Sequence, residues 1–259
     1  MEIFAFLALP IFWNRYVTQR RLFTRKGAVE FALFYCRPPC AAGLMWYNYA
    51  RFGSPFDFGA NYNLTSNDMT KRGLSLGRVA PALHYYLFAV PLFKAIFPYI
   101  HELRVNTNYI GQTISELIYG GIITTTPFLW VFALLPALRS RLSRLRLWGV
   151  VGWCLLSTVA LCALDAMMAG ILYRYLMDFA LPLTFAAALC WLALEQVLDD
   201  HRTEPAAKQL QRFFRAAMPV TVAAGMVFGF CLVFAAEPWL HSQSPALYQT
   251  VSRLVQFWL

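Results

Sequence analysis

The sequence contains little charge for its length. Only 14% of its residues are charged, whereas about 25% is usual in a soluble domain. Hydrophobic residues make up 59% of the chain and aromatic residues 17%. This composition excludes an ordinary soluble domain and indicates a protein that is largely surrounded by lipid.

Acidic residues are the scarcer charged type. The 259 residues include 13 Asp and Glu against 22 Lys and Arg, which gives a net charge of +9. Such an excess can indicate a nucleic-acid partner. The basic residues, however, form short clusters between apolar segments, where membrane orientation signals are found. We therefore predict no nucleic-acid partner and interpret the basic clusters as topology signals.

The chain also has no fixed-period repeat, no low-complexity linker and no convincing inverted pair of broken helices. The last of these is a feature of many secondary transporters, so its absence argues against a transporter but leaves that alternative open.

The six cysteines do not form a metal-binding pattern. Four lie in apolar segments, where a thiol behaves as a small hydrophobe: Cys154, Cys162, Cys190 and Cys231. Cys36 and Cys40 are four residues apart, but Arg37-Pro38-Pro39 between them interrupts regular helix, and no His or third Cys lies nearby. We expect packing roles for the cysteines, no metal site and no cofactor.

Apolar segments dominate what is present. A helix needs about 20 apolar residues to cross a hydrocarbon core of about 30 Å. Four segments satisfy this requirement and a fifth does so less clearly: residues 118–138, 148–172, 175–198, 220–236 and 28–49. We predict an all-α polytopic transmembrane helix bundle with about five full spans, a partial first helix and one long external loop. Thr124-Thr125-Thr126-Pro127 should kink the first of these spans, because proline removes a backbone donor and threonine hydroxyls can satisfy freed backbone groups.

The basic clusters give one consistent orientation. Residues 14–26, 139–146 and 199–215 carry most of the Lys and Arg of the short connections and should face the cytoplasm. The connection near Tyr173 holds only Arg174. Residues 51–116 then form an external loop, within which the apolar stretch 87–100 is too short and too rich in proline for a span and suits an interfacial segment.

The amino terminus resembles the end of a transmembrane helix. Residues 1–13 are apolar but cover only about half a span, and they lack a basic n-region and a small-residue cleavage site. We expect residues 1–259 to be a single transmembrane domain that forms the carboxyl-terminal part of a larger protein. The alternative is a re-entrant or interfacial segment.

Charged residues near the membrane are candidates for function, because each is costly in lipid and tends to face a partner or a wet cavity. Arg37 falls near the middle of its span. Asp165 lies toward the outer end of one helix, and Arg174 and Asp178 are four residues apart at the start of the next. The last three residues suit an ion-paired cluster at the external surface. The guanidinium of Arg174 either contacts a lipid-linked phosphate or forms a structural salt bridge.

Two stretches resemble bacterial multi-pass glycosyltransferases of the GT-C type. They are Tyr47-Asn-Tyr-Ala-Arg-Phe-Gly-Ser-Pro-Phe-Asp-Phe-Gly59 and Arg174-Tyr-Leu-Met-Asp178-Phe179, and the closing Pro245-Ala-Leu-Tyr248 and Phe257-Trp258 are similar too. The resemblance is to the carboxyl-terminal half of such enzymes. It implies sugar transfer from a polyprenyl-phosphate donor at the external face of a bacterial inner (plasma) membrane.

The chain departs from that pattern at its amino terminus. GT-C enzymes generally carry an acidic catalytic residue in a first external loop, and no such loop precedes Asn14. We therefore expect these residues alone to be inactive and assign no catalytic residue, although Asp57 and Asp68 are external by position.

The function expected from the resemblance is part of a membrane glycosyltransferase whose partners are the bilayer and a lipid-linked sugar donor. Arg174 would contact the phosphate, with Asp178 and Asp165 orienting it. The loop from Arg51 to Asn63, with Asp57 and Asn61, would shape the acceptor side, although its aromatic residues also suit interfacial anchoring. The alternatives are a transporter or lipid-flipping protein that uses Arg37 and Asp165, and a non-catalytic membrane scaffold.

Overall fold

The computed structural model is mostly helical and describes residues 13–18, 24–29, 38–57, 59, 75–109, 112–201, 205–236 and 242–256. Its contacts divide the chain into two compact units, Met1–Gly73 and Leu74–Leu259, and each is described by itself.

The first unit contains short helical segments. A π-helical turn, η2, covers Trp13–Thr18, and the longer helix α3 covers Pro38–Phe52. Residues 25–29 form a helical turn that Thr24 caps, since its Oγ1 accepts a hydrogen bond from the Gly27 amide at 3.1 Å. Of the predicted span 28–49, the described residues are therefore helical, and α3 begins at the prolines that were expected to interrupt the helix. Residues 30–37, which include Cys36 and Arg37, lie outside the described residues.

In the described part of the second unit, three helices are long and apolar enough to cross a membrane. They are α7 (Trp148–Ala169), α8 (Leu176–Asp200) and α9 (Pro205–Ala236), and they cover three of the predicted spans. Gly170 ends α7 with a φ of 87°, which glycine adopts without strain. Small residues on α8 are fully buried, including Ala186, Ala187 and Ala193, and such residues let helices approach closely in lipid. The four cysteines predicted to pack in apolar segments are free and buried.

The segment 118–138, predicted as one span, is not a continuous helix. It contains α5 (Ile122–Thr125), the 3₁₀ helix η7 (Pro127–Leu134) and the start of α6 (Leu135–Arg144). The chain breaks at Thr126-Pro127, as the Thr-Pro motif predicted. Thr124 Oγ1 donates to the Ala89 carbonyl at 2.6 Å, and Thr125 Oγ1 donates to the Gly121 carbonyl at 2.9 Å. The broken segment still follows α8, because Trp191 Nε1 donates to the Phe128 carbonyl at 2.9 Å.

Two antiparallel hairpins lie in the predicted external loop, where the all-α expectation had none. Strand β1 (Leu92–Phe93) pairs with β2 (Ile100–His101), and β3 (Leu103–Tyr109) pairs with β4 (Gln112–Ile118). The predicted interfacial segment 87–100 largely forms the first hairpin. Several of its apolar side chains are exposed, as suits contact with lipid: Phe88, Val90, Phe93 and Ile96.

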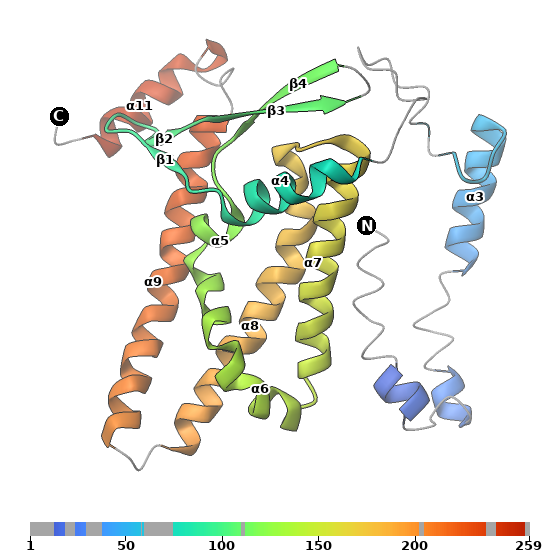
Figure 1. Ribbon diagram of the computed structural model, residues 1–259, viewed down its shortest axis with the longest axis vertical. Coiled ribbons are helices and arrows are strands. Elements are labelled where there is room, and N and C mark those ends of the chain that lie inside the picture. The colour runs from blue at the N-terminus through green and yellow to red at the C-terminus, as the bar shows by residue number, and fades with distance from the viewer. Residues whose placement is uncertain are drawn as a thin grey trace. The chain divides into compact units, whose positions relative to one another are not determined.

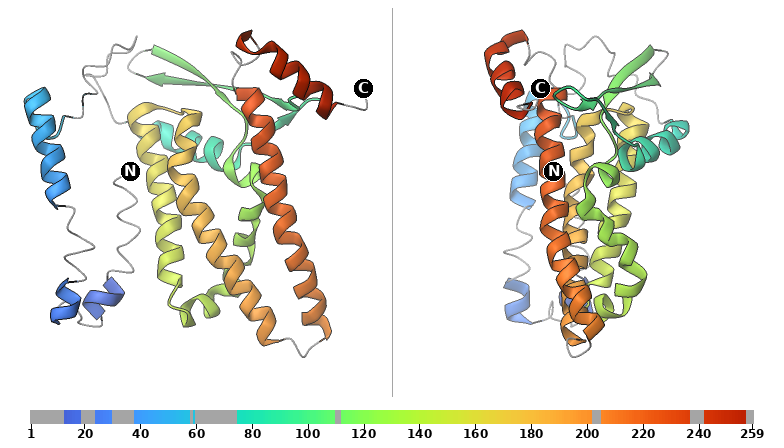
Figure 2. Two further views of the ribbon diagram at one scale, coloured as in Figure 1. Left: turned by 180° about the vertical axis from the view of Figure 1, so that it is seen from behind. Right: turned by 90° about the vertical axis from the view of Figure 1, so that its left-hand side faces the viewer.

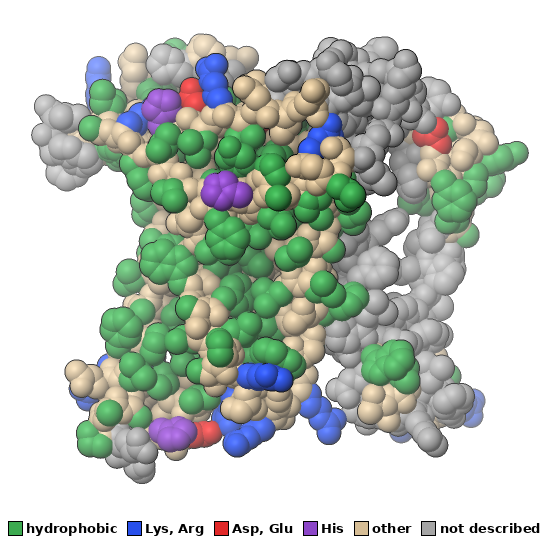
Figure 3. All heavy atoms as spheres, in the orientation of Figure 1, with side chains coloured by type: hydrophobic (Ala, Val, Ile, Leu, Met, Phe, Trp, Pro, Cys, Tyr) green, Lys and Arg blue, Asp and Glu red, His purple; other side chains and the backbone are tan. Residues whose placement is uncertain are grey.

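The elements of the second unit gather at two ends of the long helices (Figures 1 and 2). One end, called here the hairpin end, holds the two hairpins, α4 (Val79–Leu83) and α11 (Pro245–Val255). The other, the α6 end, holds α6, the end of α8 and the start of α9. Arg141 pairs with Asp200 at 2.8 Å, so the basic stretches 139–146 and 199–215 meet at the α6 end, where Figure 3 shows Lys and Arg side chains around α6.

Candidate functional site

The turn between α7 and α8 positions three of the predicted site residues at the hairpin end. Arg174 lies in the short 3₁₀ helix η8 (Tyr173–Tyr175), where its side chain is exposed and its Cζ lies 5.3 Å from the centre of the Tyr175 ring. Asp178 is exposed in the first turn of α8, where the positive end of the helix dipole favours a carboxylate. Asp165 lies near the end of α7.

The expected ion-paired cluster of these residues does not form. Among the described residues, no ion pair within 4.0 Å joins Arg174 to Asp178 or Asp165. The reason is local, because a four-residue spacing brings side chains together only on an α-helix. Arg174 belongs to a 3₁₀ turn, and α8 begins only at Leu176.

Arg174 comes close enough to Glu116, a residue to which the sequence assigned no role, for their charges to interact. Glu116 lies on β4 and is partly buried. Burial raises the pKa of the Glu116 carboxyl, and the positive charge of Arg174 partly opposes that rise. The sequence offered no signal for this pairing, because β4 itself was not predicted.

Asp165 has an unsatisfied oxygen. Its Oδ2 is buried and has no hydrogen-bond partner among the described residues. Asp178 lies close enough for the two negative charges to repel each other. A partly desolvated carboxylate with a spare acceptor can bind a hydroxyl group, a cation or a proton.

Tyr86 fixes the turn that carries these groups. The Tyr86 hydroxyl donates to the Leu172 carbonyl at 2.9 Å and accepts from the Leu172 amide at 2.7 Å. Its ring meets the edge of Phe179 with centroids 5.2 Å apart. Burial raises the pKa of Tyr86 well above its ordinary value, so the hydroxyl stays protonated and both hydrogen bonds persist at neutral pH.

The second unit has an apolar groove of about 430 Å³. It lies between α9, the break at Thr125-Pro127 and the β1–β2 hairpin, and its lining includes Phe93, Ile100, Ala224 and Cys231. Ile100 and Cys231 also belong to a packed cluster with Tyr119 and Tyr173. Tyr173 directly precedes Arg174 in the sequence, so this cluster links the groove lining to the segment that carries the guanidinium.

The remaining predicted site residues belong to the first unit. Arg51 donates from Nη1 to the Tyr47 hydroxyl at 3.0 Å, and its Cζ lies 5.1 Å from the centre of the Phe52 ring. Asp57 Oδ1 accepts a hydrogen bond from the Gly59 amide at 2.8 Å, which forms a local turn. Asn61 and Asp68 lie outside the described residues. Arg51 and Asp57 therefore have local partners within the first unit.

These features define a helical membrane protein with charged side chains and an apolar groove at one end of its long helices. Comparison of the chain with protein-family models, with curated proteins and with solved structures gave no match.

Proposed function

We propose that this chain is part of a GT-C-like glycosyltransferase that takes a sugar from a polyprenyl-phosphate donor at the external face of a bacterial inner membrane. The observation that carries the proposal is the apolar groove, because its lining residues Ile100 and Cys231 belong to the cluster against which Tyr173, the neighbour of Arg174 in the sequence, packs. An isoprenoid chain matches the groove in polarity, and a guanidinium is well shaped to bind the phosphate at its end.

The carboxylates of the same end would act on the polar part of the donor or on an acceptor. Asp165 offers an unsatisfied acceptor oxygen, which suits a hydrogen bond from a sugar or acceptor hydroxyl. Glu116, whose charge interacts with that of Arg174, would help to hold the guanidinium in place. Arg51 and Asp57 remain part of the proposed acceptor side. We also propose that the chain crosses the membrane five times. Two crossings, the broken segment 118–138 and residues 28–49, would be additional to α7, α8 and α9.

Binding of undecaprenyl phosphate to the purified full chain, measured by native mass spectrometry, tests the phosphate and groove contacts separately. Arg174→Gln should weaken binding at least about tenfold, because a charge-assisted contact is lost. Ala224→Trp should obstruct the groove and also weaken binding. The matched controls are Arg139→Gln at the α6 end and Val220→Trp, an exposed α9 position outside the groove lining. If Arg174→Gln binds undecaprenyl phosphate as tightly as Arg139→Gln does, and Ala224→Trp as tightly as Val220→Trp does, the donor site is elsewhere.

Transfer itself is measured as consumption of radiolabelled polyprenyl-phosphate glucose by the chain in a membrane extract that supplies acceptors. Transfer that is lost in Arg174→Gln and retained in Arg139→Gln supports the transferase. Because we expect these residues alone to be inactive, binding without transfer agrees with the proposal, whereas the absence of both binding and transfer favours the scaffold alternative.

A second candidate function follows from Asp165. A buried carboxylate oxygen without a partner in a membrane helix is also a common feature of proton and ion paths. Proteoliposomes loaded with a pH-sensitive dye distinguish the two functions. Proton flux that disappears in Asp165→Asn and in Arg37→Gln would establish a transporter, whereas the transferase proposal predicts no flux in any variant.

A further inference from the structure

A second cleft at the hairpin end differs in character from the apolar groove. It has a volume of about 380 Å³ and lies between the segment that leads into α4 and strand β3. Its lining comes from three separate parts of the chain: Gly77, Arg78, Pro81 and Tyr85; Arg104 to Asn108; and Ile171. The volume falls within the range of about 300–1,000 Å³ that is typical of small-molecule sites.

The cleft runs along the edge of a strand. Five consecutive residues of β3 line it, although alternate side chains of a strand point to opposite faces, so the cleft must follow the strand's edge. β3 belongs to a two-stranded sheet and pairs with β4 on one side. The other edge presents backbone groups to the cleft, and Arg78 Nη2 donates to one of them, the Asn108 carbonyl.

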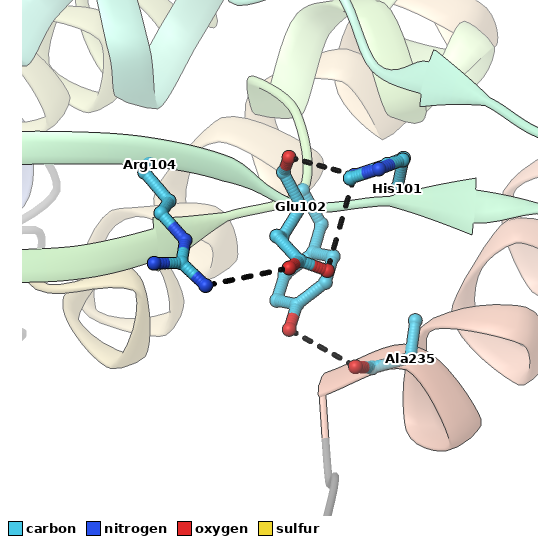
Figure 4. A network of polar contacts seen from close by, with 5 residues as sticks. His101, Glu102, Arg104 and Ala235 are labelled. Carbon is cyan, nitrogen blue, oxygen red and sulfur yellow. Dashed lines mark hydrogen bonds and ion pairs between the residues drawn. The ribbon is translucent and has the colours of Figure 1, made fainter.

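Positive charge dominates the polar lining. Arg78 and Arg104 both contribute, and none of the described residues that line the cleft is acidic. Figure 4 shows Glu102 between His101 and Arg104, but the contact to Arg104 Nη2 is 4.0 Å long and the Arg104 side chain is 74% exposed. Such a loose surface pair contributes little, so Arg104 is available to an anion from solution.

The lining also contains an unsatisfied hydroxyl. Thr107 is only 7% exposed, and its Oγ1 is buried without a hydrogen-bond partner among the described residues. This oxygen lies 3.3 Å from the position that a Cβ on Gly170 would occupy, next to Ile171 in the lining. A buried hydroxyl without a partner is destabilising, and a ligand hydroxyl or oxyanion would satisfy it.

We propose that this cleft binds a phosphate-bearing polyol, such as a sugar phosphate. The guanidiniums of Arg78 and Arg104 would bind the phosphate, and Thr107, Asn106 and the free edge of β3 would bind hydroxyl groups. The proposal goes beyond the donor site at Arg174 and does not depend on transferase activity, because it concerns binding alone. The ligand is either a free sugar phosphate or the headgroup of a lipid, since the cleft lies at the hairpin end of the membrane helices.

Equilibrium dialysis of radiolabelled glucose 1-phosphate against the full chain in detergent tests the proposal. We expect saturable binding that Arg104→Gln weakens at least about tenfold, with Arg139→Gln as the matched control at the α6 end. Thr107→Val should weaken binding about threefold to tenfold while leaving thermal stability unchanged or higher, because the substitution removes an unsatisfied buried hydroxyl. If Thr107 had only a structural role, the substitution would not weaken binding while leaving stability unchanged or higher.

Competition identifies the source of the ligand. The chain is moved into nanodiscs of phosphatidylglycerol or of phosphatidylcholine, and the bound glucose 1-phosphate is measured again. If only the phosphatidylglycerol nanodiscs displace it, the natural ligand is a lipid headgroup. If neither displaces it, the natural ligand is a free sugar phosphate. The proposal is overturned if binding is not saturable, if Arg104→Gln and Arg139→Gln behave alike, or if inorganic phosphate competes as well as glucose 1-phosphate does.

Discussion

At the scale of single residues, Tyr86 is more important to the candidate site than any of the charged groups singled out from the sequence. It is fully buried and makes both of its hydrogen bonds to one backbone unit, Leu172, in the turn that precedes Arg174. Its position in an aromatic run, His84-Tyr85-Tyr86, gave no indication of this role, because a partner 86 residues away is set by folding alone.

Tyr86→Phe should therefore destabilise the second unit by about 1–3 kcal/mol, the usual cost of leaving buried polar groups without partners. Thermal unfolding in detergent measures the effect, and Tyr49→Phe is the control because Tyr49 is 60% exposed. Equal melting temperatures for the two variants would show that the Tyr86 hydroxyl does not hold the turn.

Glu116 should make stability depend on pH. Its folded-state pKa is raised by burial, so the folded chain holds the proton to a higher pH than the unfolded chain does. Stability is then fully present below the ordinary glutamate pKa and falls as the pH rises through the raised value. Denaturation midpoints measured between about pH 4 and about pH 7 should show this decline.

Glu116→Gln should remove this decline in stability, and Arg174→Gln should enlarge it because the opposing positive charge is lost. A decline that persists in Glu116→Gln would have to come from another group.

At the scale of elements, the broken helix α5–η7 depends on a close backbone contact. A Cβ on Gly121 would lie 2.5 Å from the Leu87 carbonyl carbon and from the Phe88 amide nitrogen. The Gly121 amide donates to the Ala89 carbonyl at 2.8 Å, and the Thr124 hydroxyl bonds the same carbonyl. The start of α5 is thus hydrogen-bonded directly to the segment after η6 (His84–Phe88).

Gly121→Ala should force these backbones apart and destabilise the protein by about 1–3 kcal/mol, as is usual for overpacking. Gly229→Ala is the matched control, because Gly229 lies inside α9 and nothing lies within 4 Å of the added Cβ. That change should be neutral or stabilising by up to about 1 kcal/mol, since alanine favours helix. Thermal unfolding of both variants measures these effects. If Gly121→Ala is as stable as Gly229→Ala, the close backbone contact at Gly121 is contradicted.

At the scale of the whole molecule, the second unit has different features at the two ends of its long helices. The α6 end carries the basic stretches, and the hairpin end carries the groove, the polar cleft and Arg174. From the positive-inside rule we predict that the α6 end faces the cytoplasm and the hairpin end faces outward.

Labelling of single cysteines tests this orientation. In a background without native cysteines, Ser143→Cys at the α6 end should react with an impermeant maleimide only after the cells are permeabilised. Gln249→Cys on α11 should react in intact cells. Both positions are exposed, so accessibility reports sidedness and not burial. The opposite labelling pattern would invert the proposed topology and move the candidate site to the cytoplasm.

The sequence by itself determined the features whose free energy is a sum of contributions from the single residues of one segment. The transfer of apolar side chains to lipid is such a sum, so α7, α8 and α9 could be predicted from composition alone, and the basic clusters could be assigned to one end. The break at Thr126-Pro127 was also predictable, because proline acts on its own helix turn. The hairpins were not predicted, since β3 and β4 are short and polar and their stability comes from pairing with each other.

Only the tertiary structure decided which charged groups meet. The sequence suggested Arg174 with Asp178 and Asp165, on the assumption of a shared helix face. In the fold, Arg174 lies in η8, before α8 begins, and Glu116 on β4 comes close enough for the two charges to interact. Such pairings depend on contacts between segments that are distant along the chain, and no local pattern encodes them.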